Sequence, residues 1–381
     1  MNFYQKIKPV ATLFTGVLKT LDRYILLNFM STFFFMVPIF TMIAIVIDIS
    51  EKLDNFLAKD IPLKSIVFDY YLQFIPNINS LLWPLFTLIS VIFFTSRMAF
   101  NSELIAIIGS GVSFNKILRP YLIGAFILAG MHLFGSHILV PICNKKRVAF
   151  ENKYIWFNNR KNKSDDVHMY IGNETKVYMK RYNAEDSTII DFSIERFSDR
   201  KLLWRLDAAR ADWQPFRRDW KLTQYTIRTI NGMDEKVIQG NGKDTIINWL
   251  STAFKPTDIE RRDNLNQTMT TPELRAFIKK ERARGAGGYG YFEVELQRRT
   301  AEPVTVIILT LIGFSLAGRR VRGGMGLHLA AGAVIGALFI LFTKFSATLC
   351  INAGLPAYIG IWIPNLLFGI LAAVLLSFAQ K

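Results

Sequence analysis

Two pairs of ionisable side chains lie close enough along this sequence to do chemistry together. Asp48 and Glu51 are three residues apart, so on a helix they share one face, where paired carboxylates can carry out acid and base catalysis. At an interface such carboxylates are more often solvated or paired with a neighbour such as Lys52. His132 and His137 are five residues apart, which places them on different helix faces instead of at metal-binding spacing. We therefore predict no metal site and no clear catalytic centre.

Two lysines and a glycine-rich stretch are the other candidates. Lys344 lies inside an apolar run, where a central lysine costs roughly 3 kcal/mol on insertion scales, so it must snorkel or meet an anionic partner. Lys52 lies just beyond another apolar run and can snorkel to lipid headgroups. The glycines of residues 285–290 lack the Lys-Ser/Thr that ends a P-loop, and no strand precedes them. We interpret this stretch as a flexible hinge.

Apolar runs long enough to cross a membrane position these residues. About twenty apolar residues are needed for a transmembrane helix. The candidates are residues 24–47, 70–96, 120–142, 303–317, 327–349 and 355–379. The fourth is short and must be extended by tilt, bilayer thinning or flanking residues. The sequence thus predicts an α-helical membrane protein with six transmembrane helices.

Lysine and arginine in short loops predict the orientation, because such loops are retained in the cytoplasm. Basic residues precede the first span and join the second to the third and the fourth to the fifth: Lys6, Lys8, Lys19, Arg23, Arg97, Lys116, Arg119, Arg319, Arg320 and Arg322. With six spans these segments share one side, so both termini are expected in the cytoplasm and the large polar insert outside it. The formal net charge of +16 is largely this signature, which makes nucleic acid a poor candidate partner.

The insert has the alternation of β-strands, as in Asp191-Phe192-Ser193-Ile194-Glu195, with turn signals at Asn231-Gly232 and elsewhere. We predict an antiparallel β sandwich or jelly roll over residues 144–270. Residues 271–299 are expected to form an amphipathic helix that begins at Thr271-Pro272, followed by the hinge. The flanking parts are residues 1–143, with three spans and a cytoplasmic helix at about 101–112, and residues 300–381, with the other three.

Cys143 and Cys350 fall at the outer ends of spans, where an oxidising compartment permits a disulfide. Nothing in the sequence fixes the separation of the two sulfurs, so we expect two unpaired, lipid-facing thiols.

The loop between the second and third spans contains a short apolar helix, with Ser102 as its cap and Gly109 and Gly111 at its end. An apolar helix at the membrane face is a natural docking surface for another protein. A helix that lies on the lipid interface is an equally good interpretation.

Several motifs, taken in order, resemble the lipopolysaccharide export permeases, the LptF/LptG family. They are Leu21-Asp22-Arg23-Tyr24, Ser102-Glu103-Leu104-Ile105-Ala106 with Gly109-Ser110-Gly111, and Arg322-Gly323-Gly324. The order of three spans, outer β-domain and three spans extends the resemblance over nearly the whole chain. It implies a jelly-roll domain in the periplasm and a place in the inner membrane of a Gram-negative bacterium.

The resemblance also implies partners. Glu103 is expected to contact a separate cytoplasmic ATPase, an LptB-like dimer, with Leu104, Ala106 and Ile107 as apolar support. ATP would be bound there, in agreement with the absence of a Walker A sequence in this chain, which needs no cofactor of its own. A homologous LptF or LptG subunit and periplasmic LptC/LptA-like β-jelly-roll proteins are the other expected partners.

Lipid contacts follow from the same resemblance, since the family's cavity is lined by the first and fifth helices with basic residues at its outer rim. Lys344 and Lys52 are then candidates for lipid A phosphates, and Phe40 for the cavity. Phe192 and Ile194 are candidates for a cleft in the β-domain. One departure is that other members place several lysines near Lys52, whereas this chain has Asp48, Glu51 and Asp54 there, with Lys59 or Lys64 as possible substitutes.

The function expected is that of a permease subunit, itself non-catalytic, of an ATP-driven lipopolysaccharide exporter. Two alternatives are a permease that passes ATPase motion to outer partners without carrying a substrate, and a membrane enzyme acting on lipid A or lipid-linked sugars.

Overall fold

The computed structural model describes residues 19–58, 61–155, 165–170, 174–183, 186–198, 201–216, 218–232, 234–240, 245–246, 265–283, 289–318 and 324–379. The chain forms two compact units, a helical bundle and a β unit that comprises mainly residues 148–293. Domain boundaries near residues 143, 270 and 299 stay predictions. The basic residues Lys6, Lys8, Arg319, Arg320 and Arg322 and most of the predicted hinge lie outside the described residues.

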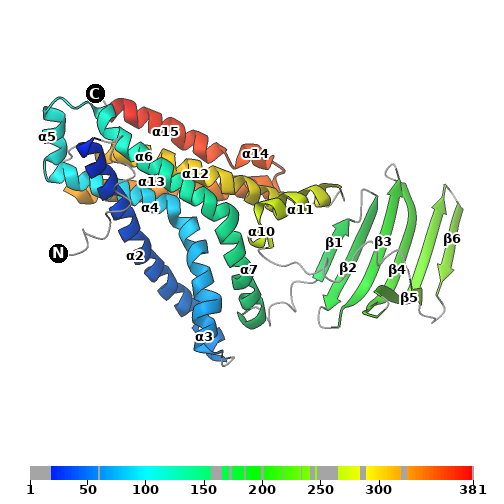
Figure 1. The fold of residues 1–381 in the computed structure, drawn as a ribbon. Helices are drawn as coiled ribbons and strands as arrows, with labels where there is room; N and C mark the ends of the chain where they lie inside the picture. The colour runs from blue at the N-terminus through cyan, green and yellow to red at the C-terminus, as the bar shows by residue number, and fades with distance from the viewer. Residues whose placement is uncertain are drawn as a thin grey trace. The chain divides into compact units, whose positions relative to one another are not determined.

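Among the described residues, the bundle contains six helices long and apolar enough to cross a membrane, as predicted (Figure 1). Two of them include short π-helical segments. In chain order the elements are α2 (Thr20–Ala58); α3 (Leu63–Ser65), η2 (Ile66–Tyr71) and α4 (Leu72–Phe100); α5 (Glu103–Gly109); α6 (Phe114–Phe134), η3 (Gly135–Leu139), α7 (Val140–Phe150) and η4 (Glu151–Ile155); α12 (Gly290–Ala317); α13 (Gly324–Asn352); and α14 (Ala357–Gly360) with α15 (Ile363–Ala379). The short fourth apolar run is extended by the preceding turns of α12 to 28 residues.

Large apolar and aromatic side chains hold the bundle together. Phe29 of α2, Phe86 of α4, Tyr121 of α6 and Phe314 of α12 are fully or almost fully buried in one cluster. The membrane-spanning parts of α4 and α12 are the most buried of the six, and those of α2 and α13 the least. The bundle therefore has a packed centre and two helices that turn much of their apolar surface outward.

Two glycines one turn apart allow α13 to lie close against α4. A Cβ atom built on Gly332 would overlap Ile92 Cδ1, and one on Gly336 would lie 2.7 Å from Leu85 Cδ1. Small residues at this spacing let helix backbones approach within a membrane, where packing replaces the hydrophobic effect as the driving force.

Replacing Gly332 by leucine is expected to lower the free energy of unfolding by about 1–3 kcal/mol, because the new side chain overpacks the contact with Ile92. Thermal unfolding in detergent measures the change. A Cβ atom built on Gly326 of the same helix would meet nothing within 4 Å, so Gly326→Leu is the matched control. Equal stability of the two variants would contradict this packing.

The inserted unit contains the predicted antiparallel β-sheet. Its strands are β1 (Asp165–Tyr170), β2 (Thr175–Asn183), β3 (Thr188–Ser198), β4 (Lys201–Gln214), β5 (Asp219–Asn231), β6 (Asp234–Gln239) and β7 (Thr245–Ile246). From β1 to β6 each strand pairs with the next, while β7 pairs with β5. The described strands thus form an open meander, in place of the crossed strand order of a Greek key. The predicted turn at Asn231-Gly232 is present, with Gly232 at φ +68°.

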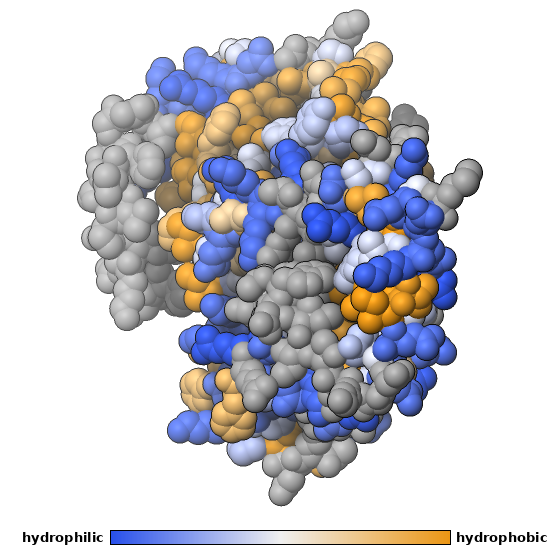
Figure 2. Space-filling view, turned by 90° about the vertical axis from the view of Figure 1, so that its right-hand side faces the viewer, coloured by the Kyte–Doolittle hydropathy of each residue, from blue (hydrophilic) through white to orange (hydrophobic). Residues whose placement is uncertain are grey.

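One face of this sheet is packed and the other is charged. Ile194 lies opposite Val177 and Leu206, and these side chains are fully buried. On the charged side Arg205 bonds Asp207 and Glu195, and the hydrogen bond to Asp207 raises the pKa of the guanidinium. One packed and one charged face are typical of an antiparallel sheet with one face in water. Figure 2 views the molecule from the right-hand side of Figure 1 and shows hydrophilic residues with hydrophobic ones in separate patches.

After the sheet come α10 (Leu265–Thr268) and α11 (Thr271–Ala283). The predicted amphipathic helix is present, since Leu274 and Ile278 are buried and Phe277 stacks on Phe292 with ring centroids 4.4 Å apart. The side chain of Glu273 accepts a hydrogen bond from the Thr270 backbone N–H at 2.8 Å, which caps the first turn.

Candidate functional site

The short helix α5 presents the predicted docking residues in two directions. Leu104 is buried in the bundle core and Ile107 packs against it, so both anchor the helix from inside. Ala106 is exposed, as are Ile105 and Ile108, which were not among the predicted support residues. A docking partner would therefore meet Ile105, Ala106 and Ile108, while Leu104 is placed for internal support.

Glu103 is the first residue of α5, and both of its carboxylate oxygens accept hydrogen bonds. Tyr24 Oη donates to Oε2 at 2.9 Å, and Asn101 Nδ2 donates to Oε1 at 3.3 Å. The predicted cap Ser102 does stand at the start of the helix, but its side chain makes no capping bond and its φ is +62°. The expectation of a Ser102 hydroxyl cap was wrong, because the left-handed backbone replaces the extended conformation that such a cap uses.

Lys52 lies in a polar cluster at the C-terminal end of α2. Its ammonium donates to Asp48 Oδ1 at 2.6 Å and also to the hydroxyl of Tyr70. The hydroxyl of Tyr71 donates to Asp48 as well, at 3.2 Å. The Lys52 side chain is 14% exposed. This is the i,i+4 pairing weighed from the sequence, so a phosphate would have to compete with Asp48 for Lys52, and lipid binding there stays a prediction.

Lys344 has a different environment, since it is exposed on α13 beside an apolar stripe. The stripe consists of Val334, Leu338, Leu341 and Phe345 at helical spacing, and all four are exposed. A lysine within such a surface has an anionic partner from outside the chain or extends to the headgroups.

The other lipid-contact candidates are partly or fully enclosed by neighbouring side chains. Phe40 is half-buried and stacks on Phe86 with centroids 5.4 Å apart. Phe192 and Ile194 are 1% and 0% exposed within the packed face of the sheet. A lipid can reach these two side chains only if the residues packed over this face of the sheet move apart. Of the suggested substitutes for the missing lysines, Lys64 is exposed in α3 and Lys59 lies outside the described residues.

The cysteines are free, as expected, but Cys350 is not lipid-facing. Its side chain is buried beside Gly360, where the chain turns between α13 and α15. The packing of this turn overrides the exposure expected from its position near a span end. Glu51 is exposed while Asp48 is buried, and no cluster of three or more metal-binding side chains occurs within the described ranges.

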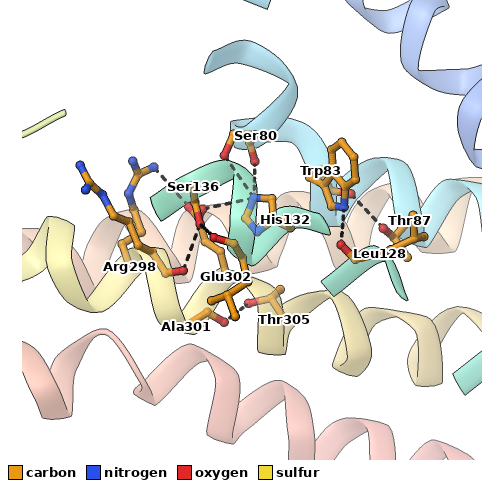
Figure 3. A network of polar contacts seen from close by, with 12 residues as sticks. Ser80, Trp83, Thr87, Leu128, His132, Ser136, Arg298, Ala301, Glu302 and Thr305 are labelled. Atoms are coloured by element: carbon orange, nitrogen blue, oxygen red, sulfur yellow. Dashed lines mark hydrogen bonds and ion pairs between the residues drawn. The ribbon is translucent and has the colours of Figure 1, made fainter. Parts of the chain in front are cut away.

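A network of charged side chains inside the bundle was not predicted (Figure 3). On α12, Arg298 pairs with Glu295 at 2.9 Å and with Glu302 at 3.2 Å, and Arg299 pairs with Glu295 at 3.0 Å. Glu302 Oε2 lies 3.7 Å from His132 Nε2 on α6. Each charge therefore has an opposite neighbour, which is the condition under which ionised groups persist in a membrane protein.

The network links α12 to three other elements. His132 Nε2 lies 3.0 Å from the carbonyl oxygen of Ser80 on α4, and Figure 3 shows the imidazole between Ser80 and Glu302. The hydroxyl of Ser136, in the π-helical segment η3, donates to the carbonyl of Arg299 at 3.3 Å. Towards α15, Asn365 Nδ2 donates to the carbonyl of Ala301 at 2.8 Å. These bonds fix the rotation of α12 against its neighbours.

If the end of α4 and the start of α6 lie at one membrane boundary, helix geometry places the network near the other. His132 is about 27 Å from the start of α6, and Ser80 about 30 Å from the end of α4, at about 1.5 Å per residue. Both distances are close to the roughly 30 Å thickness of the hydrocarbon core.

The sequence contains one signal that could have predicted this charged network. Glu295, Arg298, Arg299 and Glu302 recur at the i, i+3, i+4, i+7 spacing of one helix face, directly before an apolar run.

Comparisons with known proteins agree with this architecture. No curated protein matches the chain at significance. A family model described as "Lipopolysaccharide export system permease LptF/LptG" matches residues 23–377, which is nearly the whole chain and includes both groups of spans and the β insert. The chain is a multi-pass membrane protein that belongs to the LptF/LptG family of lipopolysaccharide export permeases.

Proposed function

We propose that this chain is the permease half of an ATP-driven exporter that takes lipopolysaccharide from the outer leaflet of the inner membrane and passes it to a periplasmic β-domain bridge. The family match over residues 23–377 carries the proposal. The exposed apolar surfaces of α2 and α13 support it, because these are the helices that would face a lipid cavity.

A homologous LptF or LptG subunit completes the cavity. On α2 the exposed side includes Phe35, Met42, Val46 and Leu57, which recur at helical spacing. Together with the stripe on α13, these exposed apolar side chains are of the kind that mark a membrane or protein interaction site. Acyl chains and the helices of the partner permease would cover this apolar surface. Lys344 beside the stripe supplies a cation for a lipid phosphate.

The β unit provides the continuation of the path. Its sheet is open, and all six residues of the edge strand β6 are exposed. An open edge can pair with a strand of another chain, so LptC/LptA-like proteins are the proposed partners on that side. The packed face that contains Phe192 and Ile194 would receive the acyl chains once it opens.

An LptB-like ATPase dimer is the proposed cytoplasmic partner, and it binds the ATP. It docks on α5 at Glu103 and the exposed Ala106, Ile105 and Ile108. Both termini are then cytoplasmic and the β unit is periplasmic. This chain takes no part in the chemistry of hydrolysis and acts as its non-catalytic transmembrane subunit.

Replacing Lys344 by alanine is expected to reduce lipopolysaccharide release from proteoliposomes about tenfold, because an enclosed lysine–phosphate contact is worth about 1.4 kcal/mol or more. Lys52→Ala should reduce it less, since Asp48 already neutralises that ammonium. Lys279→Ala, at an exposed position on α11, is the control. The phosphate contact is contradicted if Lys344→Ala leaves both release and lipid-stimulated ATP hydrolysis unchanged.

A further inference from the structure

Tyr24 and Glu103 join two segments that lie 79 residues apart in the chain. Tyr24 is in the first turns of α2, Glu103 begins α5, and their side chains meet at 2.9 Å between Oη and Oε2. A hydroxyl that donates to an ionised carboxylate makes a stronger bond than a neutral pair does. The second oxygen is held by Asn101 Nδ2, so the direction of the Glu103 side chain is set from within this chain.

An apolar contact supports the same connection. Leu104 of α5 belongs to the buried cluster that includes Ile25 and Phe29 of α2. Leu21 and Ile107 pack against that cluster from its edge. The short helix is thus fixed to the N-terminal part of α2 by one hydrogen bond and by shared core packing.

The two parts of α2 differ in how they are packed. Its N-terminal part buries Ile25, Phe29 and Phe33 completely, whereas most large apolar side chains beyond residue 38 are exposed, Met42 and Leu57 among them. Pro38 stands at the division. A proline inside a helix removes one backbone hydrogen bond and allows the helix to bend there. A displacement of the packed N-terminal part of α2 would therefore shift the exposed part beyond Pro38, with Pro38 as the pivot.

We infer that Tyr24 is a positioning residue that ties α5 to α2, so that a displacement of α5 is passed to the helix with the most exposed apolar surface. The inference rests on the proposed function, in which an ATPase binds α5 and α2 lines the lipid cavity. Tyr24 acts through Glu103: its hydroxyl holds the carboxylate on the α2 side while the exposed face of α5 remains open to the ATPase.

The experiment uses the full chain assembled with its partner permease and ATPase in proteoliposomes. Tyr24→Phe removes the hydroxyl and keeps the ring. We expect ATP hydrolysis within about twofold of the wild type and about fivefold less lipopolysaccharide released per ATP, which is the effect of losing one typical hydrogen bond. Tyr358→Phe, at an exposed tyrosine on α14, is the matched control and should release lipid normally.

Hydrogen exchange provides a measurement that a general loss of stability would not reproduce. In the wild type, binding of a non-hydrolysable ATP analogue should change the exchange of α5 and of α2 beyond Pro38. In Tyr24→Phe the change in α5 should remain and the change in α2 should disappear. The inference is overturned if release per ATP stays within twofold of the wild type, or if the α2 response persists. A wild-type complex that releases no lipopolysaccharide with ATP would instead overturn the proposed function.

Discussion

Replacing Arg299 by alanine is expected to lower the free energy of unfolding of the bundle by about 3 kcal/mol. The Arg299 side chain is 2% exposed, and its Nε lies 3.0 Å from Glu295. Loss of one partner of a buried ion pair leaves an uncompensated charge, which costs about 3–5 kcal/mol. The lower end applies here because Arg298 keeps its own bond to Glu295.

Thermal unfolding of the purified chain in detergent measures this change. Arg282→Ala is the control, because Arg282 pairs with Glu293 at an exposed site and should change stability by no more than about 1 kcal/mol. The double variant Glu295→Gln/Arg299→Met removes both charges and should recover much of the loss. If Arg299→Ala is as stable as Arg282→Ala, the network does not hold α12 in place.

The second large effect concerns assembly. Glu103→Arg is expected to abolish co-purification of the ATPase, because it reverses the charge at the docking position and removes the acceptor of the Tyr24 hydrogen bond. We expect the recovered ATPase to fall at least about tenfold, as for a charge pair worth about 1.4 kcal/mol or more.

Glu51→Arg makes the same charge reversal at an exposed position far along α2 and should leave recovery of the ATPase normal. Recovery of the ATPase with Glu103→Arg at the wild-type yield would contradict docking at α5.

Much of the fold could be predicted because long apolar runs and alternating strands are local patterns. The fourth span shows the limit of that approach. Its apolar run is short, and the turns that complete α12 carry Glu295, Arg298 and Glu302, which looked unsuitable for a membrane helix. Those charges are tolerated because they neutralise one another and meet His132 and Ser80. Contacts between residues 52 and 170 positions apart cannot be read from local spacing.

Some features of the candidate site could likewise be predicted from the sequence, and others could not. The position of the α5 helix and the pairing of Lys52 with Asp48 could be anticipated from spacing of three and four residues. The direction of α5 could not, because its left-handed start at Ser102 sets which face turns inward, and this placed Leu104 in the core. The open strand order of the sheet depends likewise on pairings that alternation alone does not specify.

Site-specific photo-crosslinking tests lipid transport most directly. Photoreactive groups at Phe40, Lys344 and Ile194 sample α2, α13 and the β unit, and each should become labelled by lipopolysaccharide during ATP turnover. A group at Phe314, which is fully buried against Tyr121 and Phe114, should remain unlabelled. Transport predicts label at all three sites that depends on ATP. The absence of lipid label at all three, in a complex that still hydrolyses ATP, would contradict it.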